Sequence, residues 1–216
     1  MFEVKILSIE GNKVTVEVSR ELLQDIYRTG AKSLLVRVLD LRKKTYDQVK
    51  KVWAMCEDIA QWTGDEISQL AYIDMVNGFI KEYVDKDFTL STSSISTARA
   101  FIQYIIHFCI VNNVPMSKPL YNHVDEDTLY KYVYWCVETR TCAVTGRKGA
   151  DIHEVEAVGM GRNRKTIHHE GQLVLPLCRE KHTEAHTIGY SKFMSRYHLT
   201  PIKLDSYLCS VLKWKE

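Results

Sequence analysis

Histidines are concentrated in one short stretch of this 216-residue chain, where five of the eight lie between residues 152 and 186. His182 and His186 are four residues apart in a predicted helix that ends at Gly189. At this spacing two imidazoles share one helix face, one turn apart, and supply half of a metal site. His153 precedes them on a segment whose apolar residues alternate, which predicts a strand and a further ligand.

These elements follow one another in a recognisable order. A long, glycine-containing loop separates the first strand from a second one, predicted over residues 173–178, which leads directly into the helix. The order resembles the HNH (ββα-metal) endonuclease family over about residues 140–190, and the run HEVEAVGMG is similar to the form found in phage HNHc nucleases. The resemblance implies a metal-dependent DNA endonuclease with a treble-clef-like ββα-metal unit.

The resemblance also implies roles for individual positions. In the family, a residue on the first strand binds the metal, the next residue is the general base, and the helix supplies further ligands. Carried over, His153, His182 and His186 are the metal ligands and Glu154 occupies the position of the general base. A carboxylate, with a reference pKa of about 4.3, is a weaker base than imidazole unless burial raises its pKa.

A second register of the same pattern makes His153 the general base and Asp151, on the same face of the strand, the metal ligand. The first register is preferred because HEVEAVGMG fits the phage form better. Gln172 stands where the family has an Asn that orients the base. His168 and His169 lie just upstream and could assist.

Phosphodiester hydrolysis gathers negative charge in its transition state, and a single hard cation can neutralise that charge. We expect one divalent ion, with Mg²⁺ as the physiological one and Mn²⁺, Ni²⁺ or Zn²⁺ also able to bind. The loop over residues 159–169 contains Arg162, Arg164 and Lys165 and no acidic residue. It is therefore predicted to lie against the phosphate backbone.

Many HNH domains carry two Cys-x-x-Cys pairs that bind a structural zinc, and here each pair has one cysteine. Cys142 is followed at the second position by Thr145, and Cys178 by Lys181. Because two thiolates do not close a tetrahedral site, we predict no structural zinc and two buried cysteines.

The upstream sequence predicts strands followed by helices. Two alternating segments joined by Glu10-Gly11-Asn12 indicate a hairpin, and a short helix capped by Ser19 follows and ends at Gly30. A third strand is predicted over residues 33–40. Helices are then predicted over residues 45–64, 65–84 and 97–113 and from Asp125 or Asp127 to Thr139.

This part resembles the phage NinB (Orf) family of recombination mediators, whose members bind single-stranded DNA. The positions that carry the resemblance are Arg42, Asp47, Gln48, Trp53, Ala54, Ser91, Thr92 and Ser93. It implies a DNA-handling module in which Arg42, Lys43 and Lys44 contact phosphates, with a single-strand-binding protein or a recombinase as a further partner. Trp53 either stacks on bases or packs in the core.

Net charge, apolar segments and cysteine spacing limit which functions and locations are possible. A net charge of +2 is nearly neutral, so contact with nucleic acid must depend on local patches. No signal peptide and no run long enough to span a membrane is evident, and the six cysteines have no framework spacing, so reduced thiols in a cytoplasm are expected.

We therefore predict an α+β protein with an N-terminal β-hairpin and helical module, residues 1–139, and an HNH domain with a C-terminal extension, residues 140–216. The expected function is DNA cleavage in phage recombination or replication, in the cytoplasm of a bacterial host. The substrate is single-stranded, duplex or branched DNA, and a homodimer could cut both strands. The alternative is a non-catalytic mediator that binds single-stranded DNA and keeps a degenerate HNH unit.

Overall fold

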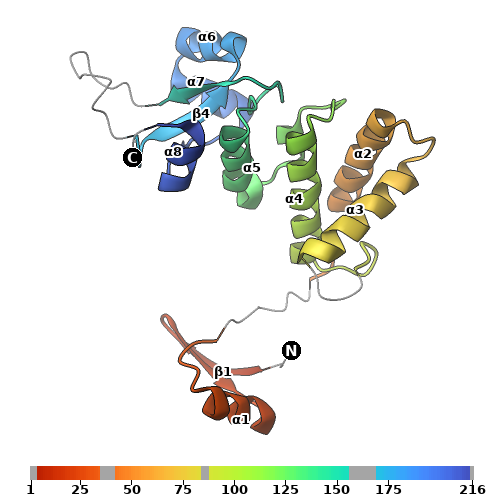
Figure 1. Ribbon diagram of the computed structural model, residues 1–216, viewed down its shortest axis with the longest axis vertical. Helices are drawn as coiled ribbons and strands as arrows, with labels where there is room; N and C mark the ends of the chain where they lie inside the picture. Colours follow the sequence, from red (N-terminus) through yellow and green to blue (C-terminus); the bar gives the residue numbers. More distant parts are fainter. Residues whose placement is uncertain (1–3, 35–41, 84–87, 156–168, 215–216) are drawn as a thin grey trace. The chain divides into compact units, whose positions relative to one another are not determined.

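The computed structural model describes residues 4–34, 42–83, 88–155 and 169–214 (Figure 1). The chain forms two compact units, residues 1–39 and residues 40–216. The expected boundary near Arg140, with separate functions for residues 1–139 and 140–216, stays a prediction. Helices and small sheets together agree with the expected α+β class.

The first unit contains a β-hairpin and one helix. Strands β1 (Lys5–Glu10) and β2 (Lys13–Glu17) pair antiparallel, as the sequence predicts, and Gly11 makes the turn at φ 60°. Helix α1 (Arg20–Thr29) begins at Ser19, whose hydroxyl accepts the backbone N–H of Leu22, and it ends at a left-handed Gly30. The predicted third strand falls largely on residues 35–41, outside the described residues.

The second unit begins with four predicted helices, all of which are confirmed: α2 (Tyr46–Thr63), α3 (Ser68–Tyr83), α4 (Ile95–Asn112) and α5 (Glu126–Glu138). A short 3-10 helix, η1 (Leu120–His123), precedes α5. Thr45 and Asp125 each begin a helix with a reciprocal capping box, which satisfies amide groups that a helix start leaves unpaired. The helices pack side by side around a core that includes Met55, Phe79 and Phe101 (Figure 1).

The histidine-bearing part of the unit is built on a three-stranded antiparallel sheet in the order β3-β4-β5. The strands are β3 (Asp151–Glu154), β4 (Leu173–Leu177) and β5 (Ile202–Lys203), and the helices are α6 (Arg179–Ile188), α7 (Tyr190–Tyr197) and α8 (Ser206–Leu212). Helix α6 packs on β3 and β4, whereas α5 packs on β4 and β5 (Figure 1). The sequence predicted β3, β4 and α6 but not α7, β5 or α8.

None of the helices in the described part of the chain combines the length and apolar character needed to cross a membrane.

Candidate metal centre

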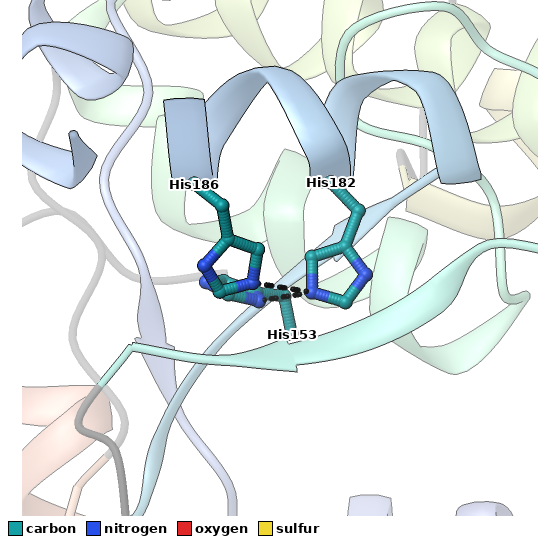
Figure 2. A group of neighbouring side chains, drawn as sticks. All are labelled: His153, His182 and His186. Atoms are coloured by element: carbon teal, nitrogen blue, oxygen red, sulfur yellow. Dashed lines mark hydrogen bonds between the residues drawn. The ribbon is translucent and has the colours of Figure 1, made fainter. Parts of the chain in front are cut away.

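Strand β3 and helix α6 bring His153, His182 and His186 together (Figure 2). β3 pairs with β4 so that His153 lies opposite Leu175, and β4 continues directly into α6. Helical spacing then directs both α6 imidazoles toward the strand, where His153 meets them (Figure 2). The structure therefore assembles the three predicted ligands at one point.

The nitrogen atoms of the three rings converge closely. His153 Nδ1 lies 2.7 Å from His182 Nε2, and His186 Nε2 lies 3.1 Å from the same atom. All three candidate ligand atoms fall within 4.8 Å of one another. Nitrogens bound to one cation at about 2.0–2.1 Å would lie roughly 2.9–3.4 Å apart, so this arrangement fits a shared divalent ion.

Burial prepares His153 for this role. The residue is 7% exposed, and its pKa is lowered to about 4 by burial, with further contributions from His182 and His186. The pKa of His182 is also lowered, first by burial. Both rings are therefore uncharged at neutral pH, which is the state that binds metal ions.

Asp151 stands behind His182 rather than within the histidine group. Its Oδ2 lies 3.8 Å from His182 Nδ1, the ring nitrogen that does not face the other histidines, and 3.6 Å from Arg179 Nη1. A carboxylate near the second nitrogen of a metal-binding histidine commonly fixes the orientation of the ring. This position suits the first register, in which Asp151 is not a ligand.

Tyr190 is a neighbour of the site that the sequence did not indicate. Its ring stacks on His153 with centroids 5.2 Å apart and an interplanar angle of 22°. Its hydroxyl is buried and has no hydrogen-bond partner among the described residues. The only feature of the sequence that could have indicated its place near the site is its position immediately after Gly189, where α6 ends.

A family model described as "Putative HNHc nuclease" matches residues 13–215. The chain belongs to this family. Comparisons with curated proteins and with solved structures found no match. The match spans the upstream helices as well as the histidine group, so the α-helical part belongs to the HNHc nuclease as much as β3, β4 and α6 do. The NinB-like reading of that part stays a prediction.

In this HNHc nuclease, Glu154 does not face the three histidines. Successive side chains of a strand point to opposite faces, so Glu154 lies across β3 from its neighbour His153. Its Oε1 is 3.1 Å from His169 Nδ1, and Gln172 Oε1 is 3.3 Å from the same nitrogen. The His169 ring also packs on Trp214, with centroids 4.6 Å apart. The sequence had placed His169 and Gln172 near the base but did not predict this pairing.

The contacts of His169 fix the tautomer of its neutral ring. Both partners of Nδ1 are oxygen atoms that accept hydrogen bonds, so Nδ1 carries the hydrogen. The lone pair then lies on Nε2. A carboxylate that orients an imidazole in this way produces a group able to accept a proton at the opposite nitrogen.

The basic residues predicted to contact DNA fall into two sets. Arg162, Arg164, Lys165 and also His168 lie outside the described residues. Arg42 and Lys43 are exposed at the start of the second unit. The backbone of Lys43 pairs with that of Ser94 in an isolated antiparallel β-bridge. The Lys44 ammonium donates to the backbone carbonyl of Ser91.

The other NinB-like positions have structural contacts. Gln48 is buried and completes the capping box of α2, and its Nε2 donates to the Ile95 carbonyl at 3.0 Å. Trp53 is half-buried and stacks on Tyr72, with centroids 4.8 Å apart. These contacts hold residues 42–48 and 91–95 together, and they do so whether or not these residues bind DNA.

Proposed function

We propose that this HNHc nuclease is a DNA endonuclease in which β3, β4 and α6 form a ββα-metal motif and His153, His182 and His186 hold one divalent cation. The observation that supports this most directly is the convergence of three ring nitrogens, one from β3 and two from α6, within 4.8 Å of one another. The family membership indicates nuclease activity independently of that geometry.

The donor set bears on the identity of the ion. A divalent cation held by the three histidines would supply Lewis-acid stabilisation of the charge on the phosphate and on the departing oxygen. Three imidazoles without a carboxylate favour Mn²⁺, Ni²⁺ or Zn²⁺ over Mg²⁺, which prefers oxygen ligands. If Mg²⁺ is the ion used in the cell, the substrate phosphate must contribute oxygen ligands, and Mg²⁺ alone should bind weakly.

We assign water activation to the pair of Glu154 and His169. In this proposal His169 Nε2 accepts the proton and Glu154 holds the ring, which removes the difficulty that a carboxylate alone is a weak base. In the order β3-β4-β5, β3 is one of the two edge strands, so both of its faces are next to an edge of the described sheet. A DNA strand along that edge would reach the histidine group from one face and His169 from the other.

Substrate contacts extend the proposal. Arg162, Arg164 and Lys165 would hold the phosphate backbone near the site, while Arg42 and Lys43 would add contacts from the helical part. A role in phage recombination or replication, in the cytoplasm of a bacterial host, follows from the resemblances. A single site cuts one strand, so a monomer should nick duplex DNA and a homodimer could cut both strands.

Cleavage of supercoiled plasmid tests the function. The wild type should nick it with Mn²⁺, Ni²⁺ or Mg²⁺ and lose activity with a chelator, whereas His153→Ala and His182→Ala should be inactive. His198→Asn is the matched control, because His198 is exposed and outside the group and asparagine tolerates its left-handed backbone. A wild type that binds DNA but cuts neither duplex, branched nor single-stranded forms would instead support the non-catalytic mediator.

A further inference from the structure

Cys142 and Cys178 lie against each other although they are distant in the sequence. Cys142 opens the turn after α5, and Cys178 immediately precedes α6. Thr145 contacts both: its backbone N–H donates to Cys142 Sγ at 3.4 Å, and its hydroxyl donates to Cys178 Sγ at 3.7 Å. The Cys142 thiol is also close enough to Cys178 to help lower the pKa of its thiol. The two sulfur atoms therefore share one small polar environment.

The turn that carries Cys142 is held from two sides. The Tyr132 hydroxyl of α5 donates to the Ala143 carbonyl at 2.7 Å, and the Ala143 N–H donates to the Pro176 carbonyl of β4 at 2.9 Å. Because β4 ends one residue before Cys178, these bonds fix the turn beside the start of α6. The proximity of the two thiols is thus a product of the backbone packing.

The positions that would complete a zinc site have other partners. The Thr145 hydroxyl is directed to Cys178, and Lys181 Nζ donates to Glu184 Oε2 at 2.8 Å and to the Tyr197 hydroxyl at 2.9 Å. A closed tetrahedral zinc site needs four protein ligands, and two thiols with these neighbours do not provide them. The two cysteines are therefore available for the reactions of free thiols.

Cys178 is the more reactive of the two. Contrary to the expectation of two buried cysteines, Cys178 is partly exposed, and it lies at the N-terminus of α6, where a helix favours negative charge. Burial raises the pKa of its thiol, but hydrogen bonds from the Lys181 backbone amide and from the two side chains described above outweigh burial and lower it. The thiolate is the nucleophilic form, so Cys178 is prepared to attack.

The remaining cysteines contrast with it. Burial raises the pKa of the Cys56 thiol to about 12 and raises the pKa values of Cys109 and Cys136 as well. Cys209 is fully buried. Inaccessible thiols with raised pKa values react slowly with disulfide reagents, so the reagent should react first at Cys178. Cys142 is itself fully buried and takes part only through its proximity to Cys178.

We propose that Cys142 and Cys178 are a thiol modification site that a low-molecular-weight disulfide such as oxidised glutathione converts to an intramolecular disulfide. The Cys178 thiolate attacks the reagent and releases one glutathione thiol. The Cys142 thiol then loses its proton and attacks Cys178 Sγ, which releases the second. Two protein thiols are oxidised and one glutathione disulfide is reduced. The bond ties the turn to the helix that carries His182 and His186.

The test treats the reduced, metal-free, full-length chain with oxidised glutathione under native conditions. The expected product has lost about 2 Da, contains one peptide linked through residues 142 and 178, and keeps four thiols that titrate after unfolding. A lasting glutathione adduct on Cys178 without ring closure, a bridge between other cysteines, or no reaction on the native chain would each overturn the proposal.

Variants separate the two steps. Cys142→Ser should stop at the mixed disulfide on Cys178, and Cys178→Ser should not react, while Cys209→Ser serves as the matched control and should react like the wild type. Should a cysteine variant fail to fold, Thr145→Val gives a milder change that removes the donor to Cys178 Sγ. It should slow the first step roughly threefold to tenfold. An unchanged rate would overturn the assigned role of that hydroxyl.

Discussion

An imidazole binds a cation only when it is not protonated, and the surroundings of His153 hold it in that state. Burial and two neighbouring imidazoles favour its neutral form, and the Tyr190 ring covers one of its faces. His182 obtains a defined orientation from Asp151 on its second nitrogen. At the scale of single residues, His153 and His182 are therefore held in the protonation state and the orientation that the proposed metal site requires.

This state makes stability depend on pH. The pKa of His153 is about 4 in the folded chain and 6.5 in the reference state, so the unfolded chain binds more protons between these values. Its contribution to stability is complete above pH 6.5 and is lost as the pH falls toward 4, which amounts to about 3 kcal/mol at 1.36 kcal/mol per pKa unit. In chelator, the free energy of unfolding of His153→Ala should fall less steeply over this range. Parallel pH curves for the two proteins would contradict the assignment.

Residues 154 and 169 should affect rate without affecting metal binding. His169→Ala should lower kcat about 10²–10⁴-fold, and Glu154→Gln should lower it less, because the amide still occupies the space beside the ring. Mn²⁺ affinity measured by calorimetry should stay as in the wild type, and added imidazole should partly restore His169→Ala. An inactive Glu154→Gln beside a fully active His169→Ala would mean that the carboxylate acts directly.

At the scale of elements, the orientation of α6 decides whether its two histidines reach β3. Glu184 links α6 to α7: its carboxylate contacts Lys181 Nζ at 2.8 Å, Arg196 Nη1 at 2.8 Å and the Tyr197 hydroxyl at 3.0 Å. The carboxylate is half-buried, so these bonds are shielded more than those of an exposed ion pair. They should help to hold α6 in place.

Glu184→Gln should therefore lower the free energy of unfolding by about 1–2 kcal/mol, because hydrogen bonds to a charged group weaken. The control is Arg28→Ala, which removes the exposed pair with Asp25 and should change stability by less than about 0.5 kcal/mol. Chemical unfolding followed by circular dichroism measures both. Equal effects would show that Glu184 contributes no more than a surface charge.

The sequence predicted elements where local signals were strong. Thr45, Asp125 and Gly30 act at helix ends as their types suggest, and the spacing of His182 and His186 placed both on one helix face. Strand alternation alone also indicates that Glu154 points away from His153. The stacking of Tyr190, the pairing of Glu154 with His169 and the short elements α7, β5 and α8 depend on tertiary contacts, which no local pattern encodes.

At the scale of the whole molecule, the two units contribute very differently to the core. Every buried apolar side chain in the described part of the chain lies between Val52 and Leu212. The hairpin and α1 have no buried residue, and Ile6, Leu7 and Ile9 of β1 are more than half exposed. Residues 40–216 therefore contain the core, the histidine group and the thiol pair.

A chain of residues 40–216 should fold without the first unit, because it contains every buried apolar side chain of the described residues. Its melting temperature should stay within about 3 °C of the full chain and its Mn²⁺ affinity should be unchanged. Nicking of plasmid should continue at saturating DNA, so that any loss is seen in KM rather than in kcat. The family match begins at residue 13, so a raised KM would assign the first unit to substrate binding. Loss of folding or of metal binding would show instead that the first unit supports the core through contacts that its exposed strands do not reveal.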